Sequence, residues 1–344
     1  MTRSFLSATA LALVTTFSGT AYADEPLKVI ASFSILGDLA KQVGGDAVEV
    51  TTLVGPNGDA HVFEPRPADA AALADAQVVL VNGLGLEGFL PRLIEASGTK
   101  APVVELTKGI DAMKNTEEEH EHHHADEESH SHEGEAAHAH ESEEGHSHEG
   151  EAAHAHSQEG EGEHHHHGEF DPHAWQSAQN VKTYIRNITD AFCAADAGDC
   201  DGYTSRAEAY TQQLETLDAD MKKAFAAIPE SERVVITSHD AFGYFGEAYG
   251  VTFLAPEGVS TDSEASAADV AALINQVRED KASAIFVESI SNPRLIEQIA
   301  SETGLKVGGE LYSDALSDAD GPAATYLEMM RHNSETIRAA LLGS

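Results

Sequence analysis

Four residues of the chain combine a metal-ligating side chain with a position where ligands commonly bind. They are His61, His173, His239 and Asp314. Three of the four follow the carboxyl ends of predicted strands, where ligands bind in open α/β sheets. Three imidazoles and one carboxylate suit a four-coordinate, borderline-soft cation, Zn2+ above all, whereas a set richer in oxygen would favour Mn2+ or Mg2+. We therefore predict a zinc site made of these residues.

The scarcity of other histidines outside one biased segment strengthens this prediction. A single loop histidine is more often a hydrogen-bonded cap or a surface residue than a ligand. Outside the biased segment the chain has four histidines, and three of them belong to the predicted site. The fourth, His332, lies about 200° around its predicted helix from the apolar stripe that contains Met330 and Ile337, so we expect it at the surface.

Residues 117–167 form the biased segment. They include 17 Asp or Glu and 16 His, with no Lys, Arg, Pro, Val, Leu or Ile. Such a composition cannot bury enough apolar surface to offset the entropy of ordering, so we predict disorder. Residues 130–140 recur at 146–156, which indicates a local duplication rather than a repeat fold. Because the entropy of loop closure rises slowly with length, the segment is interpreted as an insertion within a domain.

The insertion contains a second set of candidate metal ligands. Its His-x-His pairs and its final run of four histidines would chelate several divalent cations weakly, and its Glu residues add negative potential. It closes a few residues before His173, which favours a low-affinity collector that passes zinc to the main site. A zinc-buffering sensor and an inert polyelectrolyte remain open alternatives. Its histidines are His120, His122, His123, His124, His130, His132, His138, His140, His146, His148, His154, His156, His164, His165, His166 and His167.

The charge of the chain and its amino end limit its partners and its location. With 59 Asp and Glu against 20 Lys and Arg, the formal net charge is −39, which excludes nucleic acid and disfavours anionic lipid. Arg3, an apolar run over residues 5–17 and the small-residue site before Asp24 indicate an export signal cleaved after Ala23. The run is shorter than the ~20 apolar residues of a membrane span. In an oxidising compartment Cys193 and Cys200 are free to form a disulfide, which we predict.

The remaining residues alternate strand and helix patterns twice. Short Val- and Ile-rich runs separated by helix-like stretches are typical of βαβ units with parallel sheets, so we predict an α/β fold with two small domains. Apolar residues at spacings of three and four predict one helix over residues 203–227. The predicted strands are 27–33, 48–54, 78–82 and 102–105, then 233–238, 251–255, 284–288 and 305–309. The predicted domains are an N-terminal lobe over 24–201 that contains the insertion, a linking helix over 202–228 and a C-terminal lobe over 229–344.

Four motifs follow one another along the chain. They are Gly-Asp-Ala-His-Val-Phe-Glu-Pro around His61, Asp-Pro-His-Ala-Trp around His173, Ser-His-Asp-Ala-Phe-Gly-Tyr-Phe around His239 and Tyr-Ser-Asp-Ala-Leu-Ser around Asp314. Together they resemble the motifs of cluster A-I solute-binding proteins and, more narrowly, of the ZnuA-like periplasmic zinc-binding components of ABC importers. The resemblance covers the whole mature chain. It implies two (β/α)4 lobes bridged by a long rigid helix, with one metal in the cleft.

The resemblance also implies a function and a ligand set. We expect a periplasmic monomer without enzyme activity that delivers Zn2+ to the membrane permease of a zinc ABC importer, with a periplasmic zinc chaperone as a further partner. Manganese-binding members have a carboxylate where this chain has His239, which favours zinc. Some zinc-binding members have Glu before the first ligand histidine, where this chain has Ala60. The fourth ligand is therefore either Asp314 or water.

Zinc binds neutral imidazole, so we expect the affinity to fall below about pH 6.5, the reference pKa of histidine. Acidic residues usually orient such histidines, and Glu64, Asp171 and Asp240 are candidates because they lie close in sequence.

Three functions other than that of a zinc importer component are compatible with parts of the sequence. A zinc hydrolase needs an open coordination position and a nearby carboxylate, which Asp240 beside His239 would supply, but the sequence has no H-E-x-x-H or nucleophile-elbow motif. A zinc buffer or metallochaperone that acts through the insertion would not need the four ordered motifs. A manganese, iron or nickel importer component is distinguished from a zinc one by the residue at position 239.

Overall fold

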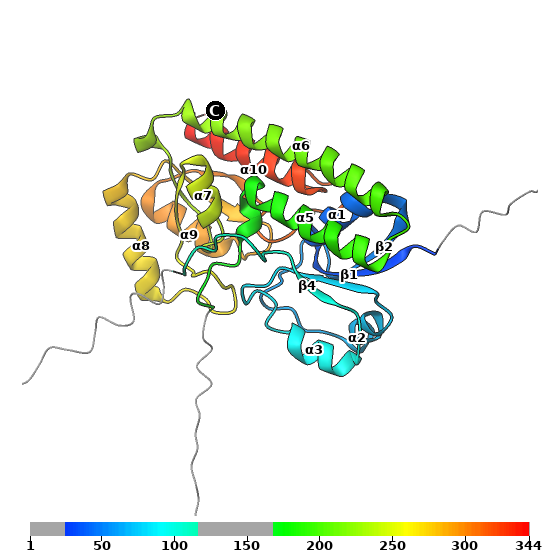
Figure 1. The fold of residues 1–344 in the computed structure, drawn as a ribbon. Helices are drawn as coiled ribbons and strands as arrows, with labels where there is room; N and C mark the ends of the chain where they lie inside the picture. Colours follow the sequence, from blue (N-terminus) through cyan, green and yellow to red (C-terminus); the bar gives the residue numbers. More distant parts are fainter. Residues whose placement is uncertain (1–24, 116–167, 344) are drawn as a thin grey trace, which may run out of the picture.

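The computed structural model describes residues 25–115 and 168–343 (Figure 1). The predicted export signal and the predicted insertion with its sixteen histidines lie outside the described residues. Within them, the chain forms two four-stranded parallel sheets, with strand orders β2-β1-β3-β4 and β6-β5-β7-β8. This confirms the predicted α/β fold class.

The first sheet is covered by helices on both faces. Alternate residues of the central strands belong to two different cores: Val29 and Leu80 pack in one, and Ile30 and Val79 pack in the other. Burial on both faces explains why β3 is a run of Val and Leu and why β1 is buried throughout except at Lys28. The strands are β1 (Leu27–Phe33), β2 (Val48–Val54), β3 (Val78–Val81) and β4 (Val103–Glu105); α1 (Ser34–Gly44) and α5 (Ala178–Ala195) lie on one face, and α2 (Pro67–Ala74) and α3 (Leu90–Ser97) on the other.

The second sheet repeats this arrangement. Ile236 and Ile285 pack against α8 and α9, whereas Val235 and Phe286 belong to the core on the opposite face. Its elements are β5 (Val234–Ile236), α7 (Gly243–Tyr249), β6 (Thr252–Leu254), α8 (Ala267–Asp280), β7 (Ala284–Glu288), α9 (Arg294–Thr303), β8 (Val307–Leu311) and α10 (Tyr326–Leu341).

All eight predicted strands begin and end within two residues of their predicted limits, and the last strand is displaced by two residues at both ends. Gly304 ends α9 in the left-handed conformation, and β8 then begins at Val307 rather than at residue 305. It continues beyond residue 309 because Glu310 and Leu311 pair with the end of β7. As a result, only Tyr312 and Ser313 lie between the end of β8 and Asp314.

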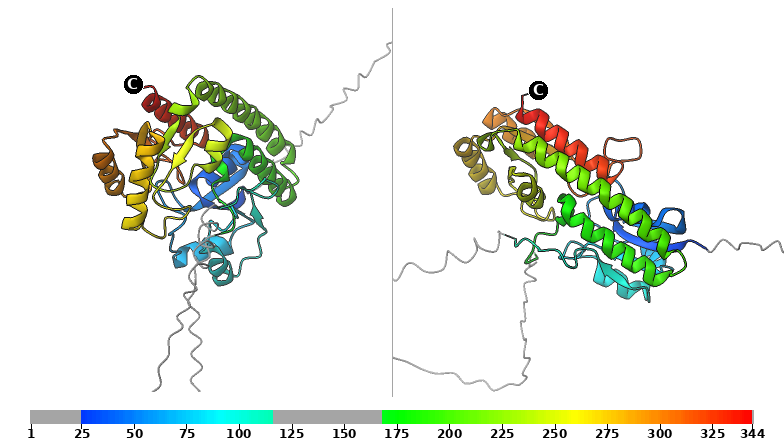
Figure 2. Two further views of the ribbon diagram at one scale, coloured as in Figure 1. Left: turned by 90° about the vertical axis from the view of Figure 1, so that its left-hand side faces the viewer. Right: turned by 45° about the horizontal axis from the view of Figure 1, so that its top comes forward.

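One long helix, α6 (Cys200–Ala226), lies along both halves of the molecule (Figures 1 and 2). Its 27 residues correspond to about 40 Å. It packs against α1 and α5 of the first half and against α7 and α10 of the second, and one continuous hydrophobic core includes residues of both sheets. A disulfide between Cys193 and Cys200 closes the turn between α5 and α6, as predicted.

The chain also crosses between the two halves after β8. The backbone N–H of Leu316 donates to Ser34 Oγ at 3.0 Å, and the N–H of Tyr326 at the start of α10 donates to Asp38 Oδ2 at 2.9 Å. This crossing was not predicted, and it places part of the predicted C-terminal lobe against α1. In the described parts of the chain, no helix is long and apolar enough to cross a membrane.

Candidate metal centre

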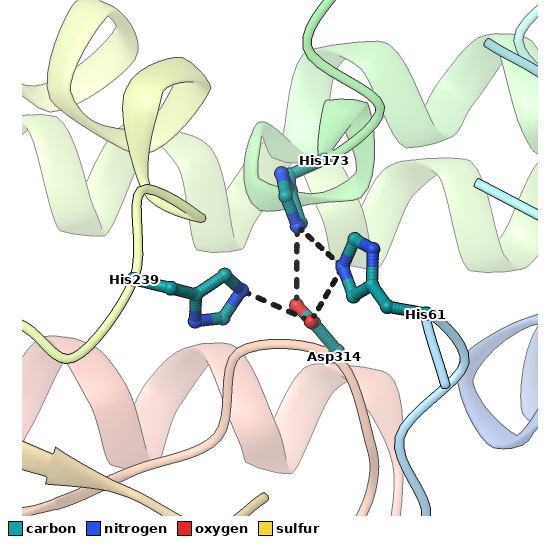
Figure 3. A group of neighbouring side chains, drawn as sticks. All are labelled: His61, His173, His239 and Asp314. Atoms are coloured by element: carbon teal, nitrogen blue, oxygen red, sulfur yellow. Dashed lines mark hydrogen bonds and ion pairs between the residues drawn. The ribbon is translucent and has the colours of Figure 1, made fainter. Parts of the chain in front are cut away.

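The structure brings the four predicted ligands into one cluster (Figure 3). One ligand atom from each residue lies within 4.8 Å of the others. His61 Nε2 lies 3.3 Å from His173 Nε2 and 3.2 Å from Asp314 Oδ2, and His239 Nε2 lies 3.1 Å from the same oxygen. In a tetrahedral zinc site with bonds of roughly 2.0–2.1 Å, neighbouring donors are about 3.3 Å apart. Three of the donor separations therefore match a tetrahedral zinc site, and all four donor atoms lie within 4.8 Å of one another.

The ends of parallel strands position these side chains. His61 lies in the loop between β2 and α2, His239 follows β5, and Asp314 follows β8. His173 precedes the short 3-10 helix η2 (Ala174–Gln176), which leads into α5. Because β2 belongs to the first sheet and β5 and β8 to the second, the cluster contains ligands from both halves of the molecule.

Direct hydrogen bonds hold the His173 and Asp314 segments together. Trp175 Nε1 and Gln176 Nε2 both donate to the carbonyl oxygen of Ser313, at 2.8 Å and 2.7 Å. The Tyr326 hydroxyl donates to the carbonyl oxygen of Trp175 at 2.8 Å. These bonds are buried, so the spacing of the two ligands is fixed by the protein itself.

The cluster is almost completely shielded from solvent. The side chains of His173, His239 and Asp314 have no exposed surface, and that of His61 is 5% exposed. Asp314 Oδ1 is buried and lies 3.6 Å from His173 Nε2, too far for a hydrogen bond, and it accepts none from the other described residues. A buried carboxylate oxygen without a donor is costly, and a bound cation would offset that cost.

Two buried carboxylates orient two of the histidines. His173 Nδ1 lies 2.7 Å from Asp171 Oδ1, and His239 Nδ1 lies 2.7 Å from Glu288 Oε2. A carboxylate at Nδ1 favours the tautomer with the proton on Nδ1, which leaves the Nε2 lone pair available for a metal. Both Nε2 atoms point into the cluster (Figure 3).

The sequence-based choice of these orienting residues was partly right. Asp171 is confirmed as the partner of His173, but Glu64 is exposed, and the carboxylate that lies at His239 Nδ1 is that of Glu288 instead of Asp240. Glu288 is the last residue of β7, which pairs with β5, and it lies 49 residues from His239. A charged residue at the end of a buried strand was the available signal.

The carboxylates raise the pKa values of the buried histidines. Burial lowers the pKa of His173, but the charges of Asp314 and Asp171 override burial and raise the pKa to about 9. At His239 burial also opposes protonation, and Glu288 and Asp314 raise the pKa well above its usual value. Burial raises the pKa of Asp314, but His239 and His173 lower it well below its usual range. The metal-free cluster therefore holds protons at neutral pH, and a captured metal must displace them.

The raised histidine pKa values widen the pH range over which zinc affinity should change. The unperturbed pKa placed the loss of affinity below about pH 6.5, but a His173 pKa of about 9 extends the competition between protons and zinc to higher pH. We expect the apparent zinc affinity to keep increasing from pH 6.5 to about pH 9. Chelator competition across this range measures it, and an affinity that is constant above pH 7 would contradict the raised pKa.

Neither Ala60 nor His332 contributes a donor atom to the cluster. Ala60 is fully buried in the core, whereas the Asp314 carboxylate lies within the cluster. His332 lies outside the cluster, where its Nε2 is 3.0 Å from the carbonyl oxygen of Glu310 and its ring packs edge-on against Tyr312. It is half-buried rather than fully at the surface.

Comparisons with known proteins agree with this fold and identify the family. The profile of the family described as "Zinc-uptake complex component A periplasmic" matches residues 29–340. The "Manganese-binding lipoprotein MntA" of Halalkalibacterium halodurans is 31% identical over 94% of this chain and 91% of its own length. The "Iron ABC transporter substrate-binding lipoprotein MtsA" of Streptococcus pyogenes serotype M1 is 29% identical over 96% of this chain and 94% of its own length. The structure of the periplasmic zinc-binding protein TroA from Treponema pallidum is similar, with a TM-score of 0.73 at 29% identity over 92% of this chain and 99% of that one.

Proposed function

Because the chain belongs to the family of periplasmic A components of zinc-uptake complexes, we propose that it captures Zn2+ outside the cytoplasm and delivers it to the permease of a zinc ABC importer. The family consists of metal-binding, substrate-binding proteins of ABC importers, which are not enzymes. The observation that carries the proposal is the buried cluster of three imidazole Nε2 atoms and one carboxylate. Cleavage of a signal after Ala23 and a two-lobe division at the helix over 202–228 belong to the same proposal.

The donor chemistry supports zinc over manganese. The relatives are named for manganese, iron or zinc, so similarity alone does not choose among these metals. Manganese prefers sites rich in oxygen and a higher coordination number, whereas zinc accepts nitrogen-rich sites with four donors. Here three of the four donors are nitrogen, and the fourth is Asp314. Asp314 also occupies the position that a zinc hydrolase would leave open for water.

Metal competition tests this choice. In the full chain, a mixture of Zn2+ with about a 100-fold excess of Mn2+ should still give a protein that contains zinc in the buried site, because imidazole-rich sites bind zinc far more tightly than manganese. Native mass spectrometry after removal of loosely bound metal measures the occupancy. Manganese occupancy under these conditions would contradict a zinc importer and would favour the manganese alternative.

The root of the insertion lies beside the cluster. Lys114 and Phe170 form an antiparallel bridge, and the N–H of Asn115 donates to the carbonyl oxygen of Glu169 at 3.0 Å. The two arms of the insertion therefore meet three residues before His173. Their proximity supports the proposal that the insertion, with its sixteen histidines, collects zinc for the site.

A deletion variant tests the collector. Removal of residues 117–167 leaves four residues between Lys114 and Phe170, a length that short hairpin loops commonly have. We expect the shortened protein to keep one tight zinc site, to lose the weak additional sites and to load more slowly from dilute zinc. Equilibrium dialysis and stopped-flow loading measure these properties. Unchanged loading would favour the inert polyelectrolyte, and loss of the tight site would favour the zinc buffer.

A further inference from the structure

One tyrosine hydroxyl connects the two halves of the molecule next to the metal cluster. Tyr244 lies in the first turn of α7 and is 2% exposed. Its hydroxyl accepts a hydrogen bond from the N–H of Met113 at 2.9 Å and donates one to the carbonyl oxygen of Asp171 at 3.0 Å. A single oxygen on α7 thus holds both chain segments that meet at the root of the insertion.

These contacts fix the residue that orients His173. The N–H of Asp171 donates to the carbonyl oxygen of Met113 at 2.9 Å, so Met113 and Tyr244 hold the Asp171 backbone on both sides. The Asp171 side chain in turn accepts from the N–H of His173 at 2.9 Å and contacts its Nδ1 at 2.7 Å. A shift of the Asp171 backbone would therefore rotate or displace the His173 imidazole.

The same helix is tied to His239. Four residues separate Tyr244 from His239. Phe242, which lies between them, and Phe245, which follows Tyr244, are fully buried. Phe242 stacks on Phe253 with ring centroids 5.0 Å apart, which anchors the start of α7 to the second half of the molecule. Tyr244 consequently connects the segments of two ligand histidines.

The close approach of α7 to Asp171 requires a residue without a Cβ atom at position 243. A Cβ atom on Gly243 would lie 2.8 Å from Asp171 Oδ2, closer than real Cβ atoms approach other atoms. Glycine at this position allows the helix to come near enough for the Tyr244 hydroxyl to reach Asp171. Gly243 and the Tyr244 hydroxyl therefore both lie close to Asp171, the residue that orients His173.

We propose that Tyr244 is a positioning residue for the bound metal. Its hydroxyl ties the His173 segment to the half of the molecule that contains His239, so that the two imidazoles keep the separation that a tetrahedral ion requires. This inference rests on the proposed metal-binding function and adds a residue outside the ligand set. It makes the coordination geometry depend on one hydroxyl in the neighbouring helix.

The test compares two Tyr→Phe variants of the full chain in the same helix. Tyr244→Phe removes the hydroxyl that holds Asp171, whereas Tyr249→Phe removes one that accepts from the N–H of Ala178 at 3.3 Å, five residues beyond His173. Substoichiometric Co2+ reports the ligand geometry through its visible absorption, chelator competition reports zinc affinity, and thermal unfolding reports stability. Gly243→Ala is a second variant that displaces Asp171 without removing a hydroxyl.

We expect Tyr244→Phe to lower zinc affinity about 10-fold, the smaller effect typical of residues that orient ligands, and to change the Co2+ absorption. Gly243→Ala should change the absorption in the same way, and Tyr249→Phe should leave the absorption and the zinc affinity as in the unmodified chain. An unaltered spectrum and affinity in Tyr244→Phe would overturn the inference, as would equal losses in both Tyr→Phe variants. A missing Co2+ band in the unmodified chain would instead contradict the proposed function itself.

Discussion

Replacement of Asp314 by alanine is expected to weaken zinc binding roughly 100-fold. Four-ligand zinc sites bind with roughly 10–16 kcal/mol, so one ligand contributes about 3 kcal/mol on average, which corresponds to a factor of roughly 100. Asp314 Oδ2 lies within 3.2 Å of two of the Nε2 atoms, so the carboxylate is the centre of the cluster. Its removal would leave three buried imidazoles and a position for water.

The measurement is zinc competition against a chelator at fixed pH, with Asp318→Ala as the matched control. Asp318 lies four residues away and accepts from Asn57 Nδ2 at 3.0 Å in an exposed contact outside the cluster. The control should bind zinc as the unmodified chain does. If Asp314→Ala keeps its affinity within a few-fold, water is the fourth ligand and the carboxylate serves only to balance charge.

Replacement of Glu288 by glutamine should also reduce zinc affinity strongly, by about 10- to 100-fold, although Glu288 is not a ligand. Glu288 Oε1 accepts from the N–H groups of Ser238 and His239 at 2.7 Å and 3.0 Å, while Oε2 faces His239 Nδ1. Glutamine would keep its oxygen on the two N–H groups and turn its NH2 toward Nδ1. The imidazole would then accept at Nδ1 and carry its proton on Nε2, the nitrogen that the metal needs.

Imidazole nitrogen NMR of the metal-free variant, in which the charge of Glu288 no longer raises the His239 pKa, checks this tautomer, and zinc competition checks its consequence. Glu310→Gln is a suitable control, because Glu310 lies in the adjacent strand β8 and its carboxylate contacts the Tyr312 hydroxyl instead of a cluster histidine. A Glu288→Gln protein with normal affinity would show that the tautomer of His239 is set by another group.

Much of the fold could be predicted because local pattern and burial agree. The central strands are buried on both faces, so their Val- and Ile-rich runs were readable, and β1, β2 and β7 begin and end where predicted. The helix α6 was visible because its buried face recurs at spacings of three and four. The crossing of the chain from β8 back to α1 was not visible, since it depends on contacts such as that of Tyr326 with Asp38, 288 residues apart.

The candidate site likewise contains residues that were predictable from local sequence and residues that were not. His61, His173, His239 and Asp314 were identifiable because each carries metal-ligating chemistry in a distinctive local motif, and the structure places them together. Glu288 lies outside these motifs and acts through strand pairing. Tyr244 lies within the motif around His239, but its contact is with Asp171, 73 residues away, which the motif does not reveal. The raised histidine pKa values were likewise unpredictable, since they follow from the burial of carboxylates beside the imidazoles.

We propose that the buried cluster, rather than the His-rich insertion, is the receptor site for zinc. Zinc titration with a competing chelator into the protein that lacks residues 117–167, with and without His61→Ala, tests it most directly. His61 is the least buried of the ligands, and its Nε2 contacts both His173 and Asp314, so its loss should leave the fold intact and the site incomplete. We predict one tight site in the shortened protein and none in its His61→Ala variant. Loss of tight binding on removal of the insertion, or tight binding that survives His61→Ala, would contradict the assignment.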